Sequence, residues 1–279
     1  MTAKPRLDNE LVRRGLAHSR EFARTLIEDG RVRLNGTRAE KPATQVALDS
    51  SIVVVSEDGA IDFVSRGGYK LSGALDAFSS IQIVGRTALD AGASTGGFTD
   101  VLLRRGIGRV IAVDVGYGQL AWPVRTDPRV EIHDRTNIRS LSLSDIGEPV
   151  DLVVADLSFI SLKLVIPALA GVTHSESDLL LMVKPQFEVG RERLGAGGVV
   201  RDAHLRVEAV EGVVGVAGAH GLGAVGVIAS PLPGPAGNVE YFIWCRQGGV
   251  KIGKAEIELA VAEGPAAEFD RSDGNHQYR

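Results

Sequence analysis

The sequence predicts an α/β protein in which a mostly parallel sheet, with helices on both faces, follows a small α+β domain. Apolar segments alternate with helical patterns between residues 66 and 248, which is typical of a parallel sheet. A glycine-rich turn at residues 92–97 follows the first of these apolar segments. Residues 1–56 have a different pattern, because two helical segments precede alternating strands. At 279 residues and 44% hydrophobic content, the chain can bury a full core.

The first domain is expected to pack two helices on a small sheet. Asp8 is predicted to cap a helix that ends at Gly15, and Ser19 a second helix that ends at Gly30. The helical period then changes to strand alternation around an Asn-Gly pair, which is a strong hairpin signal. The expected strands and turn are residues 31–34, 35–36 and 52–55.

Basic side chains accumulate in this domain, although the whole chain has a net charge of -4. Residues 4–41 contain ten Lys or Arg against six Asp or Glu. Phe22 is the only aromatic residue before Phe63, so phosphate and shape recognition of folded RNA is favoured over base stacking. A merely solvated charged face is the alternative. The candidate RNA-binding residues are Lys4, Arg6, Arg14, Arg20, Arg24 and Lys41.

Residues 57–65 are interpreted as a linker, and residues 66–248 as the second domain. Its strands are expected at residues 87–90, 109–114, 130–133, 150–156, 178–184, 224–229 and 239–246. Its helices are expected from about Lys70, after Gly97, at 162–169 and at 202–219. In residues 249–279 we expect a short docked helix at 257–261 and a disordered tail from residue 265.

The glycine turn indicates a nucleotide-like ligand at the carboxyl end of the sheet. Its spacing of Gly92, Gly96 and Gly97 is neither that of a dinucleotide fingerprint nor that of a triphosphate-binding loop. Asp90 beside the turn would repel a pyrophosphate and attract the ammonium and sulfonium groups of S-adenosylmethionine. The alternative is that the glycines only permit a tight strand-to-helix turn.

Further acidic residues follow the next strands and strengthen the ligand hypothesis. Asp114 is expected to hold ribose hydroxyls, and Asp134 to accept the adenine amino group, whereas ordinary loop capping is the alternative for both. The candidate cofactor-binding residues are Asp90, Gly92, Ser94, Thr95, Gly96, Gly97, Phe98, Asp114 and Asp134.

Four charged residues lie where packing alone does not easily explain them. Lys70 begins a helix, Asp156 and Lys184 end apolar strands, and Glu240 opens one. A sheet edge could tolerate the strand-end charges singly. Together they form a candidate catalytic set.

Both domains resemble known families. Residues 6–36 are similar to the RNA-binding domain named after the fourth protein of the small ribosomal subunit. Residues 63–246 resemble the FtsJ-like ribose methyltransferases, which have a Rossmann-like fold and a Lys-Asp-Lys-Glu tetrad matched here by the four charged residues above. With the segments 114–122, 156–161 and 183–188, the chain is similar to the TlyA family, also called haemolysins.

The resemblance implies methyl transfer from S-adenosylmethionine to a cytidine 2′-hydroxyl in ribosomal RNA of one or both subunits. Lys184 is the candidate base; burial and Lys70 would favour its neutral form, whereas Asp156 and Glu240 would favour the charged one. Asp156 is expected to orient Lys184, and Glu240 to steady Lys70 or the ribose. No metal is expected, because the histidines are not spaced as ligands.

Two other functions stay open at this point, a membrane-acting haemolysin and an inactive RNA-binding factor in ribosome assembly. The sequence shows neither a signal peptide nor a membrane-spanning segment, and the complete tetrad argues against inactivity. A single cysteine, Cys245, fits a reducing compartment. We therefore expect a cytoplasmic monomer whose partners are ribosomal RNA or ribosomal subunits, with no membrane association.

Overall fold

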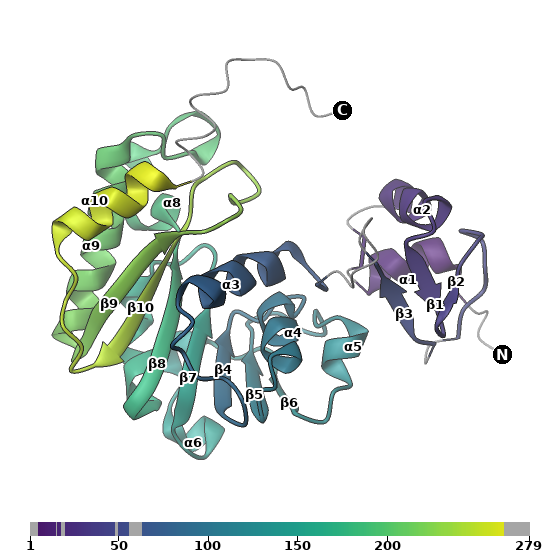
Figure 1. The fold of residues 1–279 in the computed structure, drawn as a ribbon, viewed down its shortest axis with the longest axis horizontal. Helices are drawn as coiled ribbons and strands as arrows, with labels where there is room; N and C mark the ends of the chain where they lie inside the picture. Colours follow the sequence, from purple (N-terminus) through teal and green to yellow (C-terminus); the bar gives the residue numbers. More distant parts are fainter. Residues whose placement is uncertain (1–4, 15, 18–19, 48–49, 56–62, 265–279) are drawn as a thin grey trace.

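The computed structural model describes residues 5–14, 16–17, 20–47, 50–55 and 63–264. A small N-terminal module lies beside a larger α/β domain (Figure 1). Gly15, Ser19 and the tail from residue 265, all of which were part of the predictions above, lie outside the described residues.

The N-terminal module contains two helices and a three-stranded antiparallel sheet of strand order β2-β1-β3. Its elements are α1 (Leu7–Arg13), α2 (Arg20–Glu28), β1 (Val32–Leu34), β2 (Thr37–Arg38) and β3 (Ile52–Val54). One buried cluster, which includes Leu11, Leu26 and Ile52, joins the helices to the sheet. The hairpin turn is confirmed, because Asn35 and Gly36 have φ values of 51° and 83°, as a type I′ turn requires.

The prediction that Asp8 caps the first helix is wrong. Arg6 occupies the N-cap position, and Asp8 lies inside the first turn with its side chain fully buried. The carboxylate is instead the centre of an arginine cluster that links α1 to α2, because it binds Arg6 and Arg20.

The second domain contains a seven-stranded sheet of order β6-β5-β4-β7-β8-β10-β9. Its strands are β4 (Thr87–Ala91), β5 (Arg109–Val113), β6 (Val130–His133), β7 (Val150–Ala155), β8 (Thr173–Val183), β9 (Leu222–Ala229) and β10 (Tyr241–Gln247). All pairs are parallel except those of β10, which runs antiparallel to both of its neighbours. The mostly parallel sheet is therefore confirmed.

Helices cover both faces of this sheet, as predicted (Figure 1). The α-helices are α3 (Arg66–Ala77), α4 (Gly97–Arg104), α5 (Trp122–Arg125), α6 (Leu143–Ile146), α7 (Ile166–Gly171), α8 (Pro185–Glu188), α9 (Ala203–Ala219) and α10 (Lys254–Glu263). The 3-10 turns are η1 (Ile138–Ser140), η2 (Leu162–Leu164), η3 (Arg191–Arg193) and η4 (Ala196–Gly198). One core lies under α3 and α4, and the other under α7, α9 and α10. Phe63 and Val64 also pack against the first of these cores, within the segment interpreted as linker.

Several boundaries differ from the predictions. The helix expected at 162–169 divides into η2 and α7, because Pro167 has no backbone N–H to continue a helix from the preceding turn. β8 begins at Thr173, five residues earlier than expected. The long helix expected at 202–219 is observed as α9, and the Asp202 side chain caps it by accepting from the His204 N–H. Among the described helices, none is long and apolar enough to cross a membrane.

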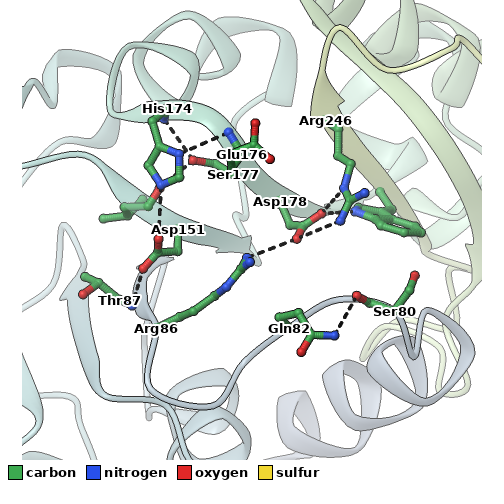
Figure 2. A network of polar contacts seen from close by, with 12 residues as sticks. Ser80, Gln82, Arg86, Thr87, Asp151, His174, Glu176, Ser177, Asp178 and Arg246 are labelled. Atoms are coloured by element: carbon green, nitrogen blue, oxygen red, sulfur yellow. Dashed lines mark hydrogen bonds and ion pairs between the residues drawn. The ribbon is translucent and has the colours of Figure 1, made fainter.

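A polar network closes the edge of the sheet opposite the glycine turn (Figure 2). The buried Asp178 carboxylate accepts hydrogen bonds from Trp244 Nε1 at 2.7 Å and Arg246 Nε at 2.6 Å. The Asp151 carboxylate accepts the Thr87 N–H at 2.8 Å and lies 3.1 Å from His174 Nε2. These contacts fix the starts of β4 and β7 and the end of β10, at the edge of the sheet away from the glycine turn.

Candidate active site

The glycine turn joins β4 to α4 and brings three strand ends together. Gly92 and Gly96 have φ values of 87° and 90°, and Ser94 has 47°. A Cβ atom on Gly92 would lie 2.6 Å from the Asp156 carbonyl oxygen. Only glycine therefore allows the end of β4 to approach the end of β7 this closely.

Gly97 likewise allows two helices, α3 and α4, to approach each other closely. A Cβ atom at this position would lie 2.9 Å from the Gly68 backbone nitrogen in the first turn of α3. The beginnings of α3 and α4 are thus in contact, and Lys70 on α3 is brought to the same edge of the sheet as the turn.

Asp114 and Asp134 bind the loops around the turn. The Asp114 carboxylate accepts the Ser94 N–H at 2.8 Å and the Gly116 N–H at 2.7 Å. The Asp134 carboxylate accepts the Gly118 N–H at 3.0 Å, and Arg125 Nη1 lies 4.0 Å away. Loop capping is therefore present at both residues, and their proposed contacts to a ribose and an adenine stay predictions.

Asp90 lies beneath the turn and is fully buried. Its Oδ2 accepts a hydrogen bond from Thr99 Oγ1 at 2.6 Å, while no described residue donates one to its Oδ1. Burial raises the pKa of Asp90 to about 7, because the charged form loses its hydration. An added cation would supply the missing partner and stabilise the ionised carboxylate.

A cavity of about 150 Å³ opens directly over this region. It is lined by the glycine turn and by two of the four candidate catalytic residues. The lining residues are Ser65, Gly67, Gly92, Ala93, Ser94, Thr95, Gly97, Phe98, Asp156, Ser158 and Lys184. Asp90, Gly96, Asp114 and Asp134, which the sequence also predicted as cofactor-binding residues, do not line this cavity.

The tetrad residues form two ion pairs. Lys184, at the end of β8, places Nζ 2.5 Å from Asp156 Oδ1 at the end of β7. Its Nζ also donates a hydrogen bond to Ser158 Oγ at 2.9 Å. Lys184 is buried, whereas Ser158 is exposed, so the amine lies at the boundary between the protein interior and solvent.

The second ion pair joins Lys70 Nζ to Glu240 Oε2 at 2.5 Å, with both side chains buried. Strand register explains why it lies near the first pair. Tyr241 pairs with Val183 in the antiparallel β10–β8 ladder, so Glu240 and Lys184 are opposite each other one position further along. The four side chains thus lie at one edge of the sheet although 170 residues separate the first from the last.

Three residues of this site were not predicted from the sequence. Thr99 binds Asp90, and Ser158 binds Lys184. Phe159 is 93% exposed and has a φ of 64°, which is rare for a bulky side chain. For Ser158 and Phe159 the available signal was their position two and three residues after Asp156, since ligand-binding residues of α/β sheets follow strand ends.

The predicted RNA-binding residues have different surroundings. Arg6, Arg20 and Arg24 lie 2.9 to 3.6 Å from the Asp8 carboxylate and are about half-exposed, and Lys41 is exposed. Arg14 is buried, pairs with Glu10 and donates to the Ser50 carbonyl, so its prediction as an RNA contact is wrong. Its helical spacing from other arginines did not reveal that it is buried. Lys4 lies outside the described residues.

Family models match both parts of the chain. The FtsJ-like methyltransferase family matches residues 63–247, and the S4 domain matches residues 5–52.

Two curated proteins are similar over most of the chain. The 16S/23S rRNA (cytidine-2'-O)-methyltransferase TlyA of Mycobacterium tuberculosis is 53% identical over 95% of this chain and 100% of its own length. Hemolysin A of Brachyspira hyodysenteriae is 34% identical, with 85% of this chain and 97% of that protein covered.

The fold is also found in a solved structure. A protein of Streptococcus thermophilus described as a hemolysin matches 97% of this chain and 98% of its own, with 34% identity and a TM-score of 0.72. Shared identity over both domains, together with the family models, defines the family of this chain.

Proposed function

This chain belongs to the TlyA family of FtsJ-like methyltransferases with an N-terminal S4 domain, and we propose that it methylates the 2′-hydroxyl of a cytidine in ribosomal RNA. The M. tuberculosis relative is named for this activity on 16S and 23S rRNA. The observation that carries the proposal is the Lys184–Asp156 ion pair at the wall of the cavity formed by the glycine turn.

The residues around that cavity fit S-adenosylmethionine as the methyl donor, with its methyl group carried on a sulfonium. Asp90 is acidic, buried and has an oxygen that no described residue binds, which suits a cationic ligand. The glycine turn leaves backbone close to the cavity, with no side chain at Gly92 or Gly97 to fill it. Asp114 and Asp134 would bind the ribose and the adenine through the oxygen capacity that their loop contacts leave.

Lys184 is proposed to bind the ribose hydroxyl and to accept its proton during methyl transfer. Asp156 and Ser158 hold the amine from two sides, so Nζ has a defined direction toward the cavity. Asp156 is proposed to orient the amine toward the ribose hydroxyl. Orientation is as important as basicity here, because the acceptor oxygen has to be aligned with the methyl group.

Lys70 and Glu240 are proposed to bind the acceptor ribose or its phosphate. Their ion pair is buried and adjoins Lys184 across the strand pairing. A buried ion pair contributes little net stability compared with apolar residues, so its presence at the site edge suits a binding role.

The N-terminal module is proposed to bind the RNA backbone through Arg6, Arg20, Arg24 and Lys41. The three arginines contribute more positive charge than the single Asp8 carboxylate removes, and they are about half-exposed. Such a surface attracts phosphates without reading bases. An rRNA substrate would place the enzyme in the cytoplasm, with rRNA or a ribosomal subunit as its partner.

The test is methyl transfer from labelled cofactor to separated ribosomal subunits and to naked rRNA, followed by mapping of the modified ribose. Lys184→Ala should lower kcat by about a hundredfold or more while calorimetric cofactor affinity stays nearly unchanged. Lys254→Ala is the control, because that lysine lies on α10 and pairs only with the exposed Glu258 among the described residues. Turnover retained by the Lys184 variant would remove this residue from the mechanism.

The hemolysin names of two similar proteins make cell lysis the second function to test. Lysis by purified protein without cofactor, unaffected by Lys184→Ala, would favour a membrane-acting protein. Subunit binding without any methyl transfer would instead favour an RNA-binding assembly factor.

A further inference from the structure

Two segments that carry the first ion pair are joined at three points. The loop of residues 156–161 follows β7, and α8 follows β8. Lys184 contacts Asp156 at the beginning of both segments, and the Phe159 and Phe187 rings lie 5.4 Å apart in the middle. The third point of contact is Glu188, the last residue of α8.

Glu188 binds the far end of this loop through both of its carboxylate oxygens. Its side chain is only 1% exposed, and Oε1 accepts the Leu162 N–H at 2.7 Å. Its Oε2 accepts the Ser161 hydroxyl at 2.5 Å and lies 3.6 Å from Lys163 Nζ. Hydrogen bonds to an ionised carboxylate are among the stronger ones, and here they also bind the start of η2.

Two side chains of the loop, Leu157 and Ile160, pack against the core on one face of the sheet. Ser158 and Phe159 are exposed, and Phe159 has the positive φ that a bulky residue adopts only when its surroundings impose it. At the other end, the Asp156 N–H donates to the Ala91 carbonyl at 3.1 Å. The loop is therefore anchored at the sheet, at the core and at Glu188, and Ser158, which binds Lys184, lies in its exposed part.

We propose that Glu188 is a positioning residue for methyl transfer. It fixes the 156–161 loop so that Asp156 and Ser158 hold the Lys184 amine in the orientation that the reaction requires. This inference rests on the proposed function. Release of the loop end would let Ser158 move away from Nζ, and a displacement of about 1 Å at a reacting group can reduce rate about a hundredfold. The residues proposed to bind the cofactor lie mainly on the turn after β4 and at the ends of β5 and β6, so cofactor binding should be spared.

The experiment compares Glu188→Ala and Glu188→Gln in the full chain. Glu188→Ala should lower kcat about tenfold to a hundredfold, with KM for S-adenosylmethionine within about twofold of the wild-type value. Glu188→Gln should restore kcat to within about threefold, because its amide oxygen can still accept from Leu162 and its NH₂ can donate to Ser161 Oγ. Amide hydrogen exchange at Leu162, measured without substrate, should be fast in the Ala variant and slow in the Gln variant.

Asp145→Ala is the matched control, because Asp145 also binds a backbone N–H and a hydroxyl at the start of a short helix, α6, away from the site. Its kcat should be unchanged. A Glu188→Ala variant with less than a tenfold loss of kcat, an equal rise in cofactor KM, or no rescue by Gln overturns the proposal. If the wild-type protein transfers no methyl group, the proposed function itself fails, whereas wild-type turnover with an unaffected Glu188→Ala variant overturns only the role of Glu188.

Discussion

At the scale of single residues, Asp90 makes the site sensitive to pH. Its pKa of about 7 lies above the value of about 4 expected in the unfolded chain, so the folded protein keeps a proton that the unfolded chain has lost. The free energy of unfolding should therefore fall as pH rises from about 4 to 7 and then level off. The total loss is on the order of 4 kcal/mol for the cofactor-free protein.

Asp90→Asn should make the cofactor-free protein more stable at high pH and weaken its binding of the cofactor. The variant has no charge to bury, so above pH 7 it should be more stable without cofactor than the wild-type protein by up to a few kcal/mol, provided that its amide finds hydrogen-bond partners. It should bind S-adenosylmethionine more weakly, since the carboxylate is proposed to bind the ligand's positive charge. Denaturation and calorimetry at pH 6 and pH 8 measure both quantities. Equal cofactor affinity for variant and wild-type protein at pH 8 would contradict the assignment of Asp90.

Phe159 is the most exposed large apolar side chain among the described residues. A 93% exposed ring beside the Lys184–Asp156 pair is placed to stack on a nucleobase of the acceptor RNA. Phe159→Ala should cost about 1 to 3 kcal/mol in kcat/KM for RNA, which is roughly fivefold to 150-fold, without a change in cofactor affinity. Phe159→Trp should preserve most of the activity, and Val84→Ala, at an exposed position before β4, serves as control. Equal activity of the Ala and Trp variants would exclude stacking.

At the scale of elements, α1 and α2 are joined by charge as well as by their apolar contact. Asp8 on α1 binds Arg6 through two hydrogen bonds and Arg20 on α2 through one. The Arg6 guanidinium holds the pKa of Asp8 well below its usual range, and Arg20 contributes a smaller effect in the same direction. Burial acts in the opposite direction. The carboxylate thus stays ionised and keeps the arginines in place.

Asp8→Asn separates two effects on RNA binding that have opposite signs. Loss of a negative charge should strengthen phosphate binding, whereas loss of the ordered arginines should weaken it. We expect RNA binding to weaken about three- to tenfold. Salt screens the added attraction between the module and the phosphates, whereas arginines that are no longer held by Asp8 must be ordered again when RNA binds. Filter binding over a series of salt concentrations measures this, with thermal denaturation as the check on folding. Glu10→Gln, at another buried carboxylate of α1 that binds arginines, is the control, and tighter binding by the Asp8 variant would contradict the ordering role.

Prediction of the elements from sequence succeeded where the apolar segments are continuous. The strands β4 to β7 were expected nearly at their observed positions because continuous apolar segments define buried parallel strands. The start of β8 was missed because residues 173–177 are polar or charged, and its pairing with β7 near Val150 is irregular. The antiparallel direction of β10 was not predicted, since strand direction depends on connections and not on the apolar pattern.

The residues of the site were also predicted only in part. The residues at strand ends were found because parallel strands bring their carboxyl ends to one edge. The burial of Asp8 and Arg14 was not found, because charge on a helix face normally indicates solvent exposure. The role of Glu188 was not predicted, since its partners Ser161 and Leu162 are distant from it in sequence.

At the scale of the whole molecule, the described residues form separate hydrophobic cores. The N-terminal cluster around Leu11 and Leu26 shares no residue with the two clusters on the faces of the large sheet. Those two clusters are divided only by the sheet itself, so they should unfold together. Cores that belong to separate domains usually unfold as separate cooperative units.

Calorimetry of the full chain should therefore show two transitions, of which only the larger one responds to S-adenosylmethionine. A ligand at about one hundred times its Kd adds about 3 kcal/mol to the unit that binds it, which corresponds to a rise of about 5 to 10 °C in Tm for a domain of this size. The smaller transition should stay in place with cofactor and shift with added rRNA, since its basic surface is proposed to bind the phosphate backbone. A single transition that moves as one unit with cofactor would show instead that the two modules are energetically coupled, and RNA binding at one would then change cofactor affinity at the other.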